Sequence, residues 1–179
     1  MKNRKVLLIV AHDGYQHIEY GEPKKILEDA GFEVVTASDQ LGDATGNDGS
    51  KTKVDVLLNR INPTDYEGIF FIGGPGALER LDNDASYAIA QDALANNLPF
   101  GAICISPRIL AKAGVLDGRK ANGWNDDGEL HGIFEEHNVE LVEKPVVIDG
   151  KLITAIGPSA AREFGEAIVL VLKKTNSIN

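Results

Sequence analysis

The sequence has little cysteine, few aromatic residues and a deficit of positive charge. Its single cysteine among 179 residues excludes an internal disulfide, and the four histidines show no metal-ligand spacing with it. Only 18 lysines and arginines balance 27 aspartates and glutamates, and the resulting net charge of −9 repels nucleic-acid phosphates and anionic lipid surfaces. No apolar run approaches the ~20 residues that span a bilayer. We therefore expect a soluble, cytoplasmic protein with no metal site and no nucleic-acid or membrane partner.

Short apolar runs alternate with helical patterns along the whole chain. Strands are expected at residues 6–10, 32–37, 68–72 and 99–104, with short edge strands in 52–58 and a hairpin of 146–148 and 152–156 around Asp149-Gly150. Helices are expected at 19–30, at 86–96 with Ser86 as the cap, at 107–113, at 129–137 and at 159–174. Gly31 and Gly114 are expected to end two of these helices. The alternation predicts one α/β domain over residues 1–179, in which helices cover both faces of a mostly parallel sheet.

In a parallel sheet, ligands bind at the carboxyl ends of the strands. Three loops lie at such ends, namely residues 12–19, 73–76 and 104–107. The functional residues are therefore expected in these loops.

Cys104 lies where a buried strand passes into a helix. Ser106 is a good N-cap residue and Pro107 suits the first helical turn. Free N–H groups and the positive end of the helix dipole favour a thiolate over a thiol. The alternative is that Cys104 is a small buried core residue. We interpret Cys104 as a reactive thiolate.

Two further features lie at the same predicted sheet edge. The backbone N–H groups of Gly74 and Ile105 are candidates for an oxyanion hole, although the glycines also fit a simple tight turn. Glu19 lies in the first turn of its helix, where an acidic residue often serves only the helix dipole. If its carboxyl lies beside the sulfur instead, burial would raise its pKa and let it act as a general acid or base.

Side chains from two loops are candidates for a pocket around the cysteine. They are His12, Tyr15, His17, Trp124 and Asn125. A lone loop histidine is usually solvated, and Trp124 is better suited to shape a pocket than to carry out chemistry. The cluster Asp126-Asp127-Glu129 is interpreted as the solvated start of a helix, because it offers too few ligands for a metal.

Five segments together resemble the ThiJ/PfpI superfamily, and within it the branch of the parkinsonism-linked protein deglycase. They are residues 5–10, the Glu19-to-Pro23 spacing, and residues 72–76, 102–107 and 153–165. The resemblance implies a flavodoxin-like three-layer fold of the class I glutamine amidotransferase type, a homodimer and no cofactor. It also implies that Cys104 is the nucleophile, Glu19 its protonated partner, and Gly74 and Ile105 the oxyanion-hole donors.

The chain departs from the superfamily at two positions. Protease-like members carry a histidine directly after the cysteine, where this chain has Ile105, and the deglycase branch has a histidine where this chain has Trp124. Peptidase chemistry would therefore lack its general base. The main hypothesis is a cofactor-independent glyoxalase or deglycase that converts small α-oxoaldehydes, such as methylglyoxal, to hydroxy acids. The alternatives are an oxidation-sensing stress protein and, less favoured, a hydrolase.

Overall fold

The computed structural model describes residues 4–177 and has a mostly parallel sheet at its centre. Within these residues the sheet has seven strands in the order β11-β12-β8-β7-β1-β3-β6. All neighbours are parallel except β11 and β12, which form a hairpin. The strands are β1 (Lys5–Ile9), β3 (Glu33–Ser38), β6 (Val56–Leu57), β7 (Gly68–Phe71), β8 (Phe100–Ile103), β11 (Val146–Asp149) and β12 (Leu152–Ala155).

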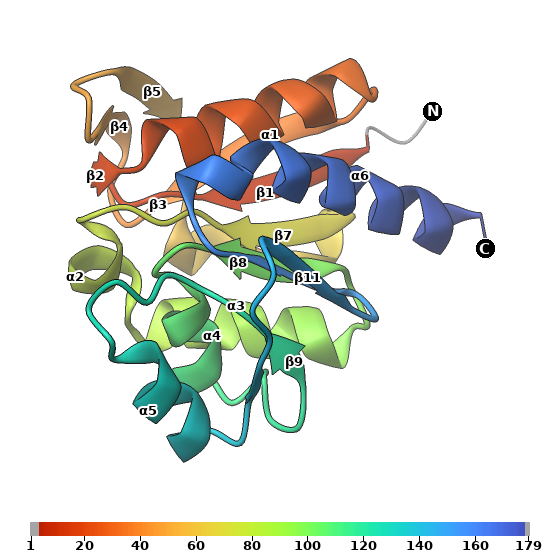
Figure 1. Cartoon of the computed structure of the whole chain (residues 1–179). Helices are drawn as coiled ribbons and strands as arrows, with labels where there is room; N and C mark the ends of the chain where they lie inside the picture. Colours follow the sequence, from red (N-terminus) through yellow and green to blue (C-terminus); the bar gives the residue numbers. More distant parts are fainter. Residues whose placement is uncertain (1–3, 178–179) are drawn as a thin grey trace.

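Helices cover both faces of this sheet. Helices α1 and α6 lie on one face, and α3 and α4 lie on the other (Figure 1). The α-helices are α1 (His17–Asp29), α2 (Ala77–Leu81), α3 (Asp84–Ala95), α4 (Pro107–Lys112), α5 (Leu130–Glu136) and α6 (Ala161–Asn176). Three 3₁₀ turns occupy Leu58–Arg60, Pro63–Asp65 and Pro158–Ala160. The layers confirm the predicted single-domain α/β fold with a flavodoxin-like arrangement.

Strand β1 shows why its sequence is continuously apolar. Val6 and Leu8 point into the core beneath α1 and α6, whereas Leu7 and Ile9 point into the core beneath α3 and α4. All four side chains are fully buried. A strand covered on both faces has no solvent side, so apolar residues occupy successive positions.

Two smaller sheets flank the main one. The first contains β2 (Asp13–Tyr15), β4 (Gly42–Gly46) and β5 (Lys51–Val54), and the second pairs β9 (Lys120–Ala121) with β10 (Glu140–Leu141). Strand β2 pairs in parallel with β4, and β4 pairs antiparallel with β5. The sequence predicted a loop at residues 12–19, where β2 forms, because a strand of three residues forms only through pairing with a distant segment.

Some predicted boundaries are wrong. Helix α3 begins after Asn83 rather than at Ser86, because the Asn83 side chain accepts the Ser86 N–H at 3.1 Å. The hairpin register pairs Asp149 with Leu152, which places Gly150-Lys151 in the turn rather than Asp149-Gly150. The predicted ends of α1 and α4 are confirmed, since Gly31 and Gly114 follow them with φ of +86° and +77°.

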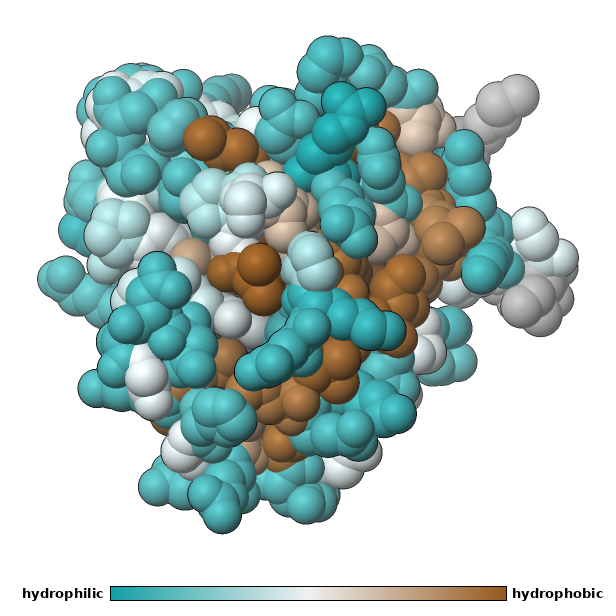
Figure 2. Space-filling model, viewed as in Figure 1, coloured by the Kyte–Doolittle hydropathy of each residue, from teal (hydrophilic) through white to brown (hydrophobic). Residues whose placement is uncertain are grey.

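The surface carries an apolar strip on the side where β11 and α6 lie (Figure 2). Ile148 of β11 is 45% exposed and Leu170 of α6 is 47% exposed. Among residues 4–177, no helix is long and apolar enough to cross a membrane. The homodimer and the cytoplasmic location stay predictions.

Candidate active site

Cys104 lies directly after β8 in a backbone conformation that is unusual for its residue type. Its φ is +65°, a left-handed value that costs a non-glycine residue about 1 kcal/mol. Two backbone hydrogen bonds hold it there: the Cys104 N–H donates to Ala155 O at 2.9 Å, and the Trp124 N–H donates to Cys104 O at 2.7 Å. The elbow turns the side chain out of the strand direction, and the residue is partly exposed.

Ser106 occupies the N-cap position of α4, but its side chain does not cap the helix. Its hydroxyl donates instead to Ile72 O at 2.7 Å, and Ser106 is fully buried. The buried carbonyl at the end of β7 requires a donor, and the hydroxyl supplies it. The predicted cap is therefore wrong, and the same side chain ties the cysteine elbow to the glycine turn.

Glu19 is held beside the glycine turn by contacts that the sequence did not predict. Its Oε2 accepts the Gly73 N–H at 2.9 Å. Gln16 caps α1, because its Oε1 accepts the Ile18 and Glu19 N–H groups at 2.7 and 2.9 Å, and the Gln16 N–H donates to Gly73 O at 2.9 Å. These bonds lock the start of α1 onto the end of β7. Glutamine is an uncommon N-cap residue, so the sequence carried little signal for this role.

Gly73 allows the cysteine and the glutamate to meet. A Cβ at this position would lie 2.6 Å from Cys104 Cβ and 2.6 Å from Glu19 Oε2. Neither contact is possible for a real side chain. The close approach therefore requires a glycine here, a need that the sequence did not reveal, since it pointed only to the amide of the neighbouring Gly74.

Burial dominates the electrostatics of the Cys104–Glu19 pair. Glu19 is fully buried, and burial raises its pKa from 4.5 to about 7, although hydrogen bonds with Cys104 and Gly73 act in the opposite direction. Burial also raises the pKa of Cys104, and the charge and hydrogen bond of Glu19 raise it further. Burial and the Glu19 carboxylate thus act against the thiolate that the sequence predicts at the helix start, and the reactive thiolate stays a prediction.

The backbone N–H groups of Ile105 and Gly74 form hydrogen bonds with Cys104, and these lower its pKa. The two donors predicted from the sequence therefore do face the cysteine. They stabilise negative charge on the sulfur, while Glu19 lies within hydrogen-bonding reach of the same side chain. The arrangement can pass one proton between sulfur and carboxyl, with the amides stabilising the thiolate form.

A cavity of about 400 Å³ opens beside Cys104. It is lined by Gly123, Trp124, Asn125, Asp126, Ile156, Gly157, Pro158 and Ser159. Gly157 borders the sulfur directly, since a Cβ there would lie 4.0 Å from Cys104 Sγ. Two of the predicted pocket residues, Trp124 and Asn125, therefore line a cavity at the cysteine.

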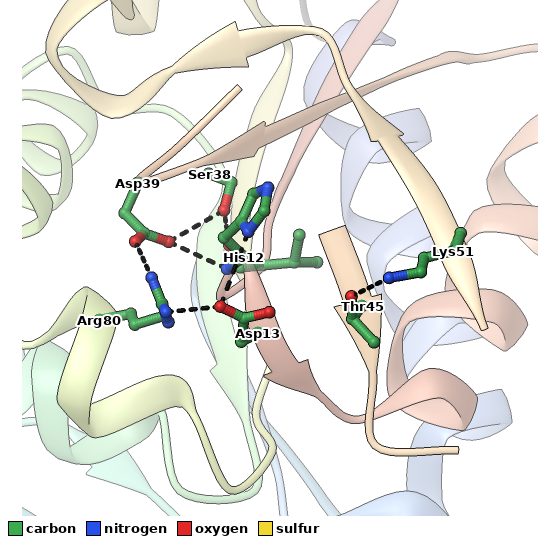
Figure 3. A network of polar contacts seen from close by, with 8 residues as sticks. His12, Asp13, Ser38, Asp39, Thr45, Lys51 and Arg80 are labelled. Carbon is green, nitrogen blue, oxygen red and sulfur yellow. Dashed lines mark hydrogen bonds and ion pairs between the residues drawn. The ribbon is translucent and has the colours of Figure 1, made fainter. Parts of the chain in front are cut away.

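His12 belongs to a polar network on another part of the sheet edge. Its backbone N–H donates to Asp39 Oδ1 at 2.9 Å, and its Nδ1 lies 3.8 Å from Asp13 Oδ2. Arg80 joins Asp13 and Asp39, and Ser38 donates to the latter (Figure 3). Hydrogen bonds to His12, Arg80 and Ser38 hold the pKa of Asp39 below its ordinary value despite partial burial. These contacts place His12 in this polar network with Asp13 and Asp39 rather than at Cys104.

Tyr15 and His17 face the small β2–β4–β5 sheet. Tyr15 is buried, its ring packs edge-on against Tyr20 at 5.4 Å, and its hydroxyl lies 3.5 Å from Ser50 Oγ. The His17 Nδ1 lies 2.8 Å from Asn47 Oδ1. Among the described residues, the polar contacts given for the two side chains are with Ser50, Asn47 and Asp48, and none is with Cys104.

Arg108 was not among the predicted site residues, yet it fixes the loop that carries Trp124. Only 2% of its side chain is exposed, and its guanidinium donates to Asp127 Oδ1 and Oδ2 at 2.7 and 2.9 Å and to Trp124 O at 3.2 Å. It also lies 5.5 Å from the centre of the Trp124 ring and 3.6 Å from Glu129 Oε2. The acidic cluster is therefore not merely solvated, because Asp127 and Glu129 neutralise a buried cation. Arginine is usually exposed, so nothing in the sequence indicated this role.

Metal binding finds no support in the geometry. Within residues 4–177, no three His, Cys, Asp or Glu side chains are grouped as a metal site requires. The groups gathered around Cys104 are its thiol, the Glu19 carboxyl and the backbone amides of Gly74 and Ile105.

The chain matches the DJ-1/PfpI family over residues 4–170. It is 33% identical over 177 residues to the uncharacterized protein MJ0967 of Methanocaldococcus jannaschii, covering 98% of this chain and 86% of that one. It is 31% identical over 172 residues to the deglycase PH1704 of Pyrococcus horikoshii, covering 94% and 99%. The crystal structure of a ThiJ/PfpI domain protein from Brachyspira murdochii superposes with a TM-score of 0.91 at 27% identity, covering 97% and 99%. With a family match over nearly the whole chain, this protein belongs to the DJ-1/PfpI family.

Proposed function

We propose that this protein is a cysteine-dependent, cofactor-independent enzyme of the deglycase type that acts on small α-oxoaldehydes. One observation carries the proposal: the fully buried Glu19 carboxyl shares hydrogen bonds with Cys104 and the Gly73 amide. The Pyrococcus horikoshii relative bears the name deglycase, which supports the reaction class. A carboxyl with a pKa near 7 is suited to move protons in both directions at neutral pH.

The first step joins the sulfur to the substrate. Cys104 attacks the aldehyde carbon of methylglyoxal, and the thiol proton passes through Glu19 to the former carbonyl oxygen. The product is a hemithioacetal, and Glu19 is again a carboxylate. The amides of Gly74 and Ile105 stabilise the negative charge that passes from sulfur to oxygen.

The second step moves hydrogen between the two carbons. Glu19 removes the proton from the sulfur-bearing carbon and returns it to the neighbouring ketone carbon. The hydroxyl proton passes to the ketone oxygen, so the isomerisation yields the lactoyl thioester without an oxidant. Water then hydrolyses the thioester, releasing lactate and the free thiol of Cys104.

Lactate formation from methylglyoxal tests this function. We expect Cys104→Ala and Glu19→Gln to lose at least about 100-fold in rate, because the nucleophile or the acid–base group is removed. Glu22→Gln is the matched control, since Glu22 lies on the same helix but is exposed. Equal turnover by wild type and Cys104→Ala would overturn the proposal.

Oxidation sensing is the second candidate, and the amides of Ile105 and Gly74 are the observation that favours it. Their N–H groups, together with a protonated Glu19, would hydrogen-bond the oxygens of a sulfinate on Cys104. The raised pKa of Cys104, caused chiefly by burial, slows this oxidation because little thiolate is present. Intact mass after mild peroxide treatment measures it: a gain of two oxygens at a rate above that of a small free thiol supports a sensor, and no gain refutes one.

A further inference from the structure

The cavity beside Cys104 has one aromatic wall and almost no charge. Trp124 supplies the aromatic surface, and Ser159, which carries a hydroxyl, is also among the lining residues. Among the described residues that line the cavity, Asp126 is the only charged one, and it is exposed. A ligand that approaches the sulfur through this cavity therefore meets a carboxylate and no cation of the cavity wall.

The nearest buried cation is occupied by other groups. Arg108 gives both arms of its guanidinium to Asp127 and a further hydrogen bond to the Trp124 carbonyl. It is also only 2% exposed. The positive charge is thus neutralised inside the protein and does not face the ligand.

A neighbouring hollow adds no net charge to the wall of the cavity. It has a volume of about 320 Å³ and shares Gly123, Asn125 and Ile156 with the cavity. It adds Glu143 and Lys144, one charge of each sign. These two charges offset each other for a ligand at a distance.

The reacting groups contribute negative charge of their own. Cys104 and Glu19 lie in hydrogen-bonding contact, and their pair becomes anionic when it loses a proton. This charge and that of Asp126 have the same sign. Both repel an anion that approaches the sulfur, and the effect of an exposed charge weakens as salt is added.

We propose that the cavity selects neutral and cationic carbonyl compounds and excludes those that carry a carboxylate, with Asp126 as the specificity-determining residue. This inference rests on the proposed function for its substrate class. It extends that function, because α-oxo acids and α-oxoaldehydes present the same carbonyl chemistry to a thiol and differ in charge. An aldehyde linked to an amine would be accepted for the same reason that an α-oxo acid is rejected.

Alkylation of Cys104 by iodoacetamide and iodoacetate tests the selection without requiring turnover. The two reagents have nearly the same size and the same leaving group but differ by one charge. Because the chain has one cysteine, intact mass reports alkylation at Cys104 alone. We expect wild type to disfavour iodoacetate, relative to the same ratio for 2-mercaptoethanol, by several-fold at low salt.

Variants that change the charge of one residue show whether Asp126 causes the low relative rate of iodoacetate. Asp126→Asn should raise the relative iodoacetate rate by about twofold, the effect of one unit charge acting through water, and Asp126→Lys by about fourfold. High salt should abolish the rate differences between wild type and both Asp126 variants. Glu136→Gln is the matched control, because Glu136 is an exposed carboxylate on α5 that does not line the cavity.

The outcomes separate this inference from the proposed function. Wild type with the same reagent ratio as 2-mercaptoethanol overturns the inference, and so does an Asp126→Asn ratio equal to that of wild type. A shift of equal size in Glu136→Gln also overturns it, since the effect would then come from net charge. If the ratios behave as expected but no carbonyl compound is turned over, the charge selection stands and the proposed function fails.

Discussion

Replacing Glu19 by glutamine should remove a pH-dependent loss of stability. Glu19 is fully buried, and burial raises its pKa from 4.5 to about 7 in the folded protein. In the unfolded chain the carboxyl returns to its ordinary pKa. The folded state therefore holds a proton that the unfolded state has released, so stability falls as the pH rises through this window and is constant above it.

The magnitude follows from the two pKa values. An increase from 4.5 to about 7 corresponds to about 3 kcal/mol at 1.36 kcal/mol per tenfold change. Between about pH 5 and pH 8 the wild type should lose most of this amount, about 2 to 3 kcal/mol, because the titration is incomplete at both ends. The glutamine side chain does not titrate, so Glu19→Gln should lose none of it.

Urea denaturation at several pH values and constant ionic strength measures the effect. The fluorescence of Trp124, the single tryptophan, reports unfolding. Glu22→Gln removes an equal charge from the exposed side of α1 and should follow the wild-type slope. Parallel slopes for wild type and Glu19→Gln between about pH 5 and pH 8 would refute the raised pKa of this carboxyl.

Two further predictions concern packing around the site. Gly73→Ala should destabilise the protein by about 1–3 kcal/mol in urea unfolding, because the added methyl would lie 2.6 Å from side-chain atoms of the cysteine–glutamate pair. Gly132→Ala, in open space on α5, should instead be neutral or more stable by about 0.5–1 kcal/mol, and equal losses for both variants would contradict the packing argument. Asp127→Asn should cost about 1.5–3 kcal/mol, because it weakens charge-assisted hydrogen bonds to the buried arginine of α4. It should also increase acrylamide quenching of Trp124, whereas unchanged quenching would show that this ion pair does not hold the loop.

Local patterns in the sequence determined the layers of the fold. The continuous apolar run of β1 indicated a strand covered on both faces, and Gly31 and Gly114 marked helix ends with positive φ. The sequence did not predict the short strands or the helix starts that depend on single contacts. Strand β2, of three residues, forms only because β4 lies beside it, and the start of α3 depends on one hydrogen bond from Asn83.

At the candidate site too, some features could be predicted from the sequence and others arise only from tertiary contacts. The resemblance to the superfamily implied that Glu19 is the partner of Cys104 and that the amides of Gly74 and Ile105 serve the cysteine, and the structure brings these groups into contact. The sequence did not predict that Arg108 holds the Trp124 loop, because a buried arginine with carboxylate partners cannot be told from a solvated one by sequence alone. The surroundings that set the pKa of Cys104 likewise come from the tertiary structure. A helix start can be read locally, but the pKa of a thiol depends on burial and on a carboxyl that lies distant in the sequence and adjacent in the fold.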